Sequence, residues 1–250
     1  RNSIIEKDIS IAEIVQKTML KFDNTAGSVF RVEYRQKCVE KIGGDFFSVK
    51  NFSLNQTGIF IGDVTGHGVA SALFTSLLKF ITDELFTRYS NNPAEFLVAL
   101  NSGISGYMSN YFLTGICAFI RSMEDKGKYE LLFANGGHPS PVIVKSDGSV
   151  VITRSRGPLI GCSISPNYTN HIVSLESGDR LFLFTDGVTE TTCAETGNIL
   201  GSDDELLQLF SGAVQADTGM FLDRIIQGLN SYRGTETIED DLLIIGINIP

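Results

Sequence analysis

The chain has 250 residues, and its 29 Asp and Glu exceed its 20 Lys and Arg, which gives a formal net charge of −9. With 42% hydrophobic and 20% charged residues it is too apolar for a disordered chain, and it is long enough to bury a sizeable core. The acidic surplus disfavours nucleic acid as a partner, and the four scattered cysteines and the lack of a long apolar run predict a cytoplasmic chain with no membrane segment.

The first predicted element is a helix from Ile9 to Phe22. Its apolar residues recur at helical spacing, and Ser10 followed by Glu13 has the spacing of a capping box at a helix start. This helix either packs on its own domain or reaches an upstream domain or a second copy of the chain. Because the chain begins with Arg1 rather than Met, we expect it to be part of a longer protein, and the sequence leaves both alternatives open.

The remaining elements alternate between strands and helices. In the helix predicted at 69–87, the apolar residues Leu73, Leu77, Phe80 and Ile81 share one face. In chain order we predict strands at 30–35, 45–54 and 57–64, helices at 69–87 and from Asn92, strands at 113–121, 128–134, 140–146, 149–154, 171–175 and 180–185, helices at 203–213 and 217–232, and a strand at 242–249. This order predicts an α+β fold of antiparallel sheets with helices outside.

Several aspartates lie at the ends of apolar strands. Asp45 begins one strand, Asp63 and Asp186 end two others, and Asp240 with Asp241 precedes the last. Each alone is typical of a turn residue or a helix cap. Their recurrence favours a cluster of carboxylates, and carboxylates near a core are costly unless they are paired or bound to a cation. All-oxygen ligands select Mg²⁺ or Mn²⁺, so the pattern predicts a metal centre.

Longer motifs make the interpretation specific. They occur in a fixed order: Gly43-Gly44-Asp45-Phe46-Phe47, Gly62-Asp63-Val64-Thr65-Gly66-His67-Gly68, Asn135-Gly136-Gly137-His138-Pro139, Thr185-Asp186-Gly187-Val188-Thr189-Glu190 and Asp240-Asp241-Leu242. This ordered set resembles the SpoIIE/RsbU-type branch of the PPM metal-dependent serine/threonine phosphatases. The resemblance implies a central antiparallel β-sandwich flanked by helices, formed by residues 25–250, with residues 1–24 as an N-terminal connector helix.

The same resemblance implies the roles of the aspartates. Asp63 would bridge two Mn²⁺ or Mg²⁺ ions, Asp45 and the backbone carbonyl of Val64 would hold one ion, and Asp186 and Asp240 would hold the other. We prefer Asp240 to Asp241 as the ligand, and a third ion is left open. Two metal ions at such a site lower the pKa of a water that bridges them, and the resulting hydroxide can attack a phosphoester.

Two histidines have more than one interpretation. His67 is either a general acid for the leaving oxygen or a local turn residue, and we favour the turn. His138 either contacts substrate or orients the site through Asn135, or it belongs to a structural turn.

The resemblance implies a phosphatase for phosphoserine or phosphothreonine on a STAS-type anti-sigma-factor antagonist, within bacterial partner switching. It also implies an upstream sensor or receiver domain, and the first helix is a candidate for homodimer contacts. The alternative is a catalytically weak module that binds and sequesters a partner. Retention of every expected ligand position argues against this alternative.

Overall fold

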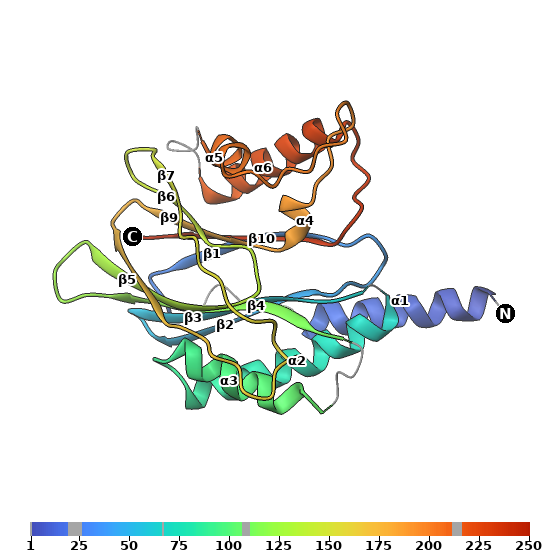
Figure 1. The fold of residues 1–250 in the computed structure, drawn as a ribbon, viewed down its shortest axis with the longest axis horizontal. Helices are drawn as coiled ribbons and strands as arrows, with labels where there is room; N and C mark the ends of the chain where they lie inside the picture. Colours follow the sequence, from blue (N-terminus) through green and yellow to red (C-terminus); the bar gives the residue numbers. More distant parts are fainter. Residues whose placement is uncertain (1, 20–26, 67, 107–110, 212–216) are drawn as a thin grey trace.

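The computed structural model describes residues 2–19, 27–66, 68–106, 111–211 and 217–250. Two five-stranded antiparallel sheets face each other (Figure 1). The first has the order β1-β10-β9-β6-β7 and the second the order β2-β3-β4-β5-β8. The strands are β1 (Arg31–Lys37), β2 (Asp45–Ser53), β3 (Gln56–Val64), β4 (Leu113–Ser122), β5 (Lys128–Gly136), β6 (Val142–Val144), β7 (Val150–Ile152), β8 (His171–Glu176), β9 (Arg180–Phe184) and β10 (Leu242–Asn248). The predicted α+β sandwich is confirmed.

Helices cover both outer faces of the sandwich, so that the fold has four layers (Figure 1). Helices α2 (Val69–Arg88) and α3 (Pro93–Ile104) pack on the β2–β8 sheet, and α5 (Asp203–Phe210) and α6 (Thr218–Arg233) pack on the β1–β7 sheet. A short helix, α4 (Asp186–Thr189), follows β9 directly. Each sheet therefore buries both faces, which explains why its strands read as nearly continuous apolar runs.

Three apolar layers hold this arrangement together. The middle layer lies between the two sheets and contains Phe47, Ile61, Ile116, Leu183 and Ile245. The other two layers lie beneath the α2–α3 pair and beneath the α5–α6 pair. Because successive side chains of a strand point to opposite faces, central strands such as β3 and β9 contribute to the middle layer and to one outer layer.

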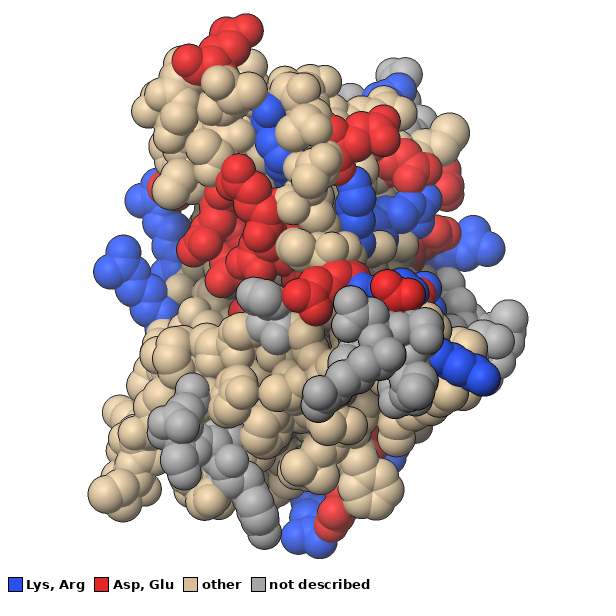
Figure 2. Space-filling view, turned by 90° about the vertical axis from the view of Figure 1, so that its right-hand side faces the viewer, with Lys and Arg blue, Asp and Glu red and all other residues tan. Residues whose placement is uncertain are grey.

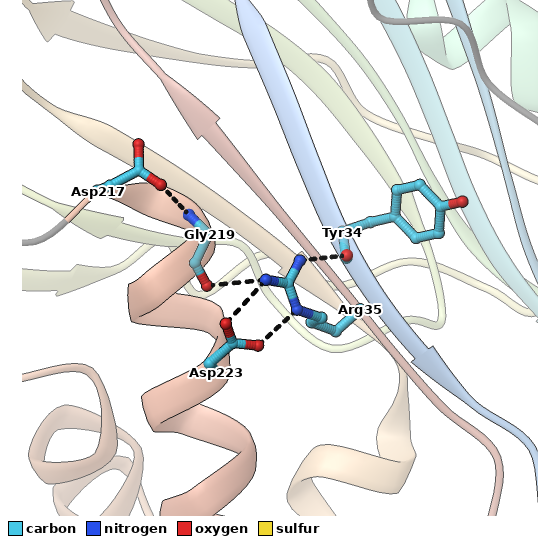
Figure 3. Close-up of polar contacts among 5 residues, drawn as sticks. All are labelled: Tyr34, Arg35, Asp217, Gly219 and Asp223. Carbon is cyan, nitrogen blue, oxygen red and sulfur yellow. Dashed lines mark hydrogen bonds and ion pairs between the residues drawn. The ribbon is translucent and has the colours of Figure 1, made fainter.

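The α6 helix is attached to the edge strand β1 by one arginine (Figure 3). Arg35 donates from Nε and Nη2 to the two carboxylate oxygens of Asp223, at 2.6 and 3.0 Å, and Nη2 also donates to the Gly219 carbonyl at 3.1 Å. Asp217 accepts the Gly219 N–H at 3.1 Å and caps the helix. Such a two-pronged contact fixes the helix direction relative to the strand.

The first helix, α1 (Asn2–Met19), begins earlier than the sequence indicates. Ser10 lies inside the helix and its hydroxyl donates to the Glu6 carbonyl, so the predicted cap at Ser10 and Glu13 is wrong. The end of the predicted helix, at Phe22, lies outside the described residues. The helix packs against α2, which fits the alternative that it packs on its own domain and leaves the others untested.

The predicted apolar face of α2 is largely exposed. Leu73 is 67% exposed and Phe80 is 70% exposed, whereas Ile81 packs against the core. The buried face contains small residues such as Ala72 and Thr75 beside Leu78 and Phe86. Small residues allow α1 and the loop before β2 to approach closely, and helical periodicity alone does not show which apolar stripe faces inward.

Among the residues that the structure describes, no helix is both long enough and apolar enough to cross a membrane. The predicted cytoplasmic location stays a prediction.

Candidate metal centre

Asp45 and Asp63 lie directly opposite each other across β2 and β3, at one end of the sandwich. Phe47 and Ile61, each two residues further into its strand, pack in the middle layer. Because side chains alternate along a strand, both carboxylates point into the space between the sheets. The register of this hairpin therefore places the two acids side by side, as the strand-end pattern predicts.

Asp45 is the most buried of the candidate ligands, with 1% of its surface exposed. Its Oδ2 accepts a hydrogen bond from Thr185 Oγ1 at 2.7 Å, and Oδ1 is buried with no partner among the described residues. Burial, and then the nearby charge of Asp63, raise the pKa of Asp45 well above its usual range. A buried carboxylate oxygen without a donor is costly, and a cation would remove that cost.

The charges of Asp186 and Asp240 act on Asp63, and the charge of Asp240 acts on Asp186. Burial and the charges of Asp186 and Asp240 raise the pKa of Asp63 to about 7. Burial and the charge of Asp240 raise the pKa of Asp186 to about 6. The acids from β3, α4 and the loop before β10 therefore converge, and the face at the right of Figure 1 carries a group of acidic side chains near its centre (Figure 2).

Asp240 and Asp241 have different environments. Asp241 is 5% exposed, and its carboxylate accepts hydrogen bonds from the Val39 N–H and the Gly44 N–H, both at 2.8 Å. Asp240 is exposed, and its Oδ1 accepts the Asp241 N–H at 2.8 Å. Asp241 thus secures the loop before β2, whereas Asp240 retains oxygen lone pairs for a ligand.

Backbone oxygens gather beside Gly44. A Cβ atom at this glycine would lie 2.6 Å from the Val64 carbonyl oxygen, 3.0 Å from Asp63 Oδ1 and 3.2 Å from the Gly66 carbonyl oxygen. Oxygens of this kind suit Mg²⁺ or Mn²⁺. Within the described part of the chain, no group of three or more Asp, Glu, His or Cys side chains already has the arrangement that holds a metal ion.

Asn135 and His138 build a turn behind the centre. Asn135 Oδ1 accepts the His138 N–H at 2.8 Å, and its Nδ2 donates to the His138 carbonyl at 2.9 Å. His138 Nδ1 is 2.8 Å from Thr114 Oγ1, and Thr114 pairs with Asp63 across β3 and β4. Burial lowers the pKa of His138 to about 3, so its ring is neutral at pH 7. These contacts favour the structural interpretation of both residues.

His67 lies outside the described residues, so its two interpretations stay open. Sequence reasoning missed three residues that shape the centre: Thr185, which orients Asp45, and Gln16 and Gly44, which act at the loop before β2. Thr185 and Gly44 each lie next to a candidate ligand within one of the sequence motifs, so their positions could have indicated a role at the centre. Gln16 lies in a helical stripe and carries no local signal.

Comparison with known proteins identifies the family of the chain. The sequence matches the family described as Stage II sporulation protein E (SpoIIE) over residues 53–250. It is 28% identical over 189 residues to phosphoserine phosphatase RsbU of Bacillus subtilis, covering 74% of this chain and 54% of RsbU. It is 23% identical over 190 residues to phosphoserine phosphatase RsbP of the same organism, covering 76% of this chain and 47% of RsbP. The chain thus spans about half the length of these relatives.

Solved structures show the same fold. The SiaA-PP2C domain of Pseudomonas aeruginosa superposes with a TM-score of 0.84 at 21% identity, covering 100% of this chain and 98% of that one. The PP2C phosphatase domain of SpoIIE from Bacillus subtilis, with a fragment of its regulatory domain, gives a TM-score of 0.70 at 16% identity, covering 90% of this chain and 64% of that one. The chain belongs to the SpoIIE family of PPM-type proteins and has the PP2C fold.

Proposed function

We propose that the chain is a metal-dependent protein phosphatase that hydrolyses phosphoserine or phosphothreonine. The observation that carries this proposal is Asp45, a buried carboxylate with an unpaired oxygen, directly opposite Asp63 and within the influence of Asp186. The relatives named phosphoserine phosphatases support the reaction. A structurally similar protein, RsbX, is described in complex with magnesium, which supports the choice of ion.

The residues present fit two divalent ions. Asp63 would bridge both, Asp45 and the Val64 carbonyl would hold one, and Asp186 and Asp240 would hold the other. Bound in this way, two ions supply an activated water and offset the charge of the phosphoryl oxygens. Calorimetric titration with Mn²⁺ would determine whether two or three ions bind.

The surrounding residues position these ligands. Thr185 accepts the Leu243 N–H at 3.0 Å and donates to Asp45, so the carboxylate direction is set by the backbone of β10. Asp241 fixes the Gly43-Gly44 turn by its bond to the Gly44 N–H. Gly44 leaves the Val64 carbonyl accessible, since a side chain there would collide with it. These contacts limit how far the ligands have to move to close around an ion.

The substrate and its context are also proposals. We propose a phosphorylated STAS-type anti-sigma-factor antagonist as substrate, in a partner-switching pathway. One structural neighbour joins RsbU and RsbW domains of Rv1364c from Mycobacterium tuberculosis, and another belongs to the bacterial stressosome. We further propose that residues 1–24 connect an upstream sensor or receiver domain to the phosphatase domain at 25–250, with a homodimer through this helix as one arrangement.

The test is hydrolysis of a phosphoserine protein with and without Mn²⁺. Asp63→Asn and Asp186→Asn should abolish turnover, whereas Asp147→Asn, an exposed acid whose side chain bonds Ser149, should retain it. Calorimetric titration with Mn²⁺ separates an enzyme from a sequestering module, because a module that lost its site binds no pair of ions. A folded, metal-loaded chain that hydrolyses neither a phosphoprotein nor an aryl phosphate contradicts the proposal.

A further inference from the structure

A cavity adjoins the candidate metal centre. It has a volume of about 400 Å³, and its lining includes the candidate ligand Asp240 and Gly187, the residue that follows the candidate ligand Asp186. Thr191, Thr192 and Ile199, from the segment after α4, form one wall. Arg233, in the last turn of α6, forms part of the lining as well. The cavity is therefore within reach of any substrate whose phosphoryl group lies between Asp186 and Asp240.

Arg233 is buried without an ion-pair partner. Only 6% of its surface is exposed. Its Nη2 donates to Thr191 Oγ1 at 3.2 Å and its Nη1 donates to Asn230 Oδ1 at 3.3 Å, and both acceptors are neutral. Among the described residues, no carboxylate lies within ion-pair distance of the guanidinium. A guanidinium has five N–H donors, so several remain for a ligand.

Burying a cation among neutral acceptors is unfavourable. A buried cation loses its hydration, and burial accordingly lowers the pKa of Arg233. Glu239 is near enough for its charge to act on Arg233, but it is exposed at the cavity, as is Glu190. The cavity is thus lined by one buried cation, Arg233, and by three exposed carboxylates, those of Glu190, Glu239 and Asp240. Water and salt screen exposed charges much more than buried ones, so these acids offset the charge of the guanidinium only in part.

We propose that Arg233 binds an oxyanion of the phosphoprotein substrate in this cavity. This inference rests on the proposed phosphatase function. The planar fork of arginine matches the paired oxygens of a phosphoryl or carboxylate group. The oxyanion is either an oxygen of the phosphoryl group itself or the carboxylate of a residue that flanks the phosphoserine. The chemistry of recognition is the same for both.

The test uses Arg233→Gln, which removes the charge, and Arg233→Lys, which keeps the charge and loses the fork. Arg224→Gln is the matched control because Arg224 lies on the same helix and is exposed. Thermal unfolding and Mn²⁺ calorimetry first establish that each variant is folded and binds metal. If Arg233→Gln does not fold, Arg233→Lys carries the test, because the loss of the fork alone weakens paired-oxygen binding.

Two measurements distinguish the two sources of the oxyanion. In the first, calorimetry gives the Kd of inorganic phosphate for the Mn²⁺-loaded chain. If the phosphoryl group is the ligand, Arg233→Gln raises this Kd about 10- to 100-fold and Arg233→Lys raises it less. In the second, phosphoserine peptides carry Glu or Gln beside the phosphoserine. If a flanking carboxylate is the ligand, the wild type prefers the Glu peptide in kcat/KM and Arg233→Gln loses that preference.

The proposal is overturned if folded Arg233 variants stay within about twofold of the wild type in both measurements. It is also overturned if Arg224→Gln shifts the same quantities as far as Arg233→Gln does. Phosphate calorimetry needs no turnover. A wild type that binds phosphate through Arg233 but hydrolyses no phosphoserine peptide would therefore contradict the proposed function and leave the binding site supported.

Discussion

Gln16 of α1 and Gly43 of the loop before β2 exchange two hydrogen bonds. The Gln16 Nε2 donates to the Gly43 carbonyl at 2.8 Å, and the Gly43 N–H donates to Gln16 Oε1 at 3.3 Å. The same Nε2 also donates to Thr75 Oγ1 of α2 at 2.8 Å. One buried amide thus links two helices to the turn that precedes Asp45.

Gln16→Ala should loosen this turn. Because buried donors and acceptors lose their partners, we expect a loss of about 1–3 kcal/mol in the free energy of unfolding and weaker Mn²⁺ binding. Urea unfolding and calorimetry measure the two effects. Lys17→Ala, which removes only a surface pair with Glu13, should leave the free energy of unfolding nearly unchanged. Unchanged Mn²⁺ affinity in Gln16→Ala would show that α1 is not coupled to the centre.

Asp240→Asn and Asp241→Asn should have opposite effects. Asp240→Asn weakens Mn²⁺ binding and leaves stability nearly unchanged, because its side chain is exposed and an amide oxygen can still accept the Asp241 N–H. Asp241→Asn turns an amide toward a backbone N–H and should cost about 2–3 kcal/mol of stability. Urea unfolding measures the stability of each variant, and titration with Mn²⁺ measures its metal affinity. Wild-type Mn²⁺ affinity in Asp240→Asn would contradict the assignment of Asp240 as ligand.

Gly44→Ala should weaken metal binding strongly. Its Cβ would lie 2.6 Å from the Val64 carbonyl oxygen, so that this oxygen or the turn has to move. We expect the Kd for Mn²⁺ to rise about tenfold or more. Gly103→Ala is the matched control, because a Cβ there meets open space on α3, and it should add about 0.5–1 kcal/mol of stability. If Gly44→Ala binds Mn²⁺ normally, the Val64 carbonyl is not a ligand.

His138 makes the fold sensitive to acid. Its pKa is about 3 in the folded chain, whereas the usual value is 6.5, so between these values only the unfolded chain binds the proton. Stability therefore rises with pH across this window, and moving from pH 7 to pH 5 costs about 2 kcal/mol through His138. Wild type and His138→Asn should be unfolded in urea at both pH values. Buried aspartates contribute with the opposite sign, equally in both proteins, and the difference between the proteins isolates His138.

An equal loss of stability on acidification in wild type and His138→Asn would contradict the assignment. The asparagine amide can replace Nδ1 as the partner of Thr114, so the variant should keep its structure at pH 7.

The sequence predicted the strand content well and the helix faces poorly. The strand hairpin at 45–64 was predictable because Asp45 and Asp63 end apolar runs, and its register brings them together. The burial of α2 was not predictable, because its inner face combines small residues such as Ala72 and Thr75 with Leu78 and Phe86, while large apolar residues such as Phe80 are exposed. Tertiary contacts decide such a face, and neither propensity nor periodicity contains them.

The candidate centre shows the same division. The candidate aspartates were predictable because a charged residue directly beside an apolar strand can be recognised from the sequence alone. The roles of Gln16 and Arg233 were not predictable, because each depends on a tertiary contact. Gln16 bonds Gly43 of the loop before β2, and Arg233 lines a cavity beside the candidate metal centre. The structural interpretation of Asn135 and His138, which the sequence left open, is favoured once their mutual hydrogen bonds are visible.

The position of β10 has a consequence for how activity arises during synthesis. This strand is late in the sequence but lies between β1 and β9 in the sheet, and Asp240 and Asp241 immediately precede it. A nascent chain can form the β2–β3 hairpin early, yet it cannot join β1 to β9 or bring Asp240 beside Asp186 until β10 has left the ribosome. Partially synthesised chains would therefore lack the complete candidate metal centre, which forms only when the last strand takes its place in the middle of the sheet.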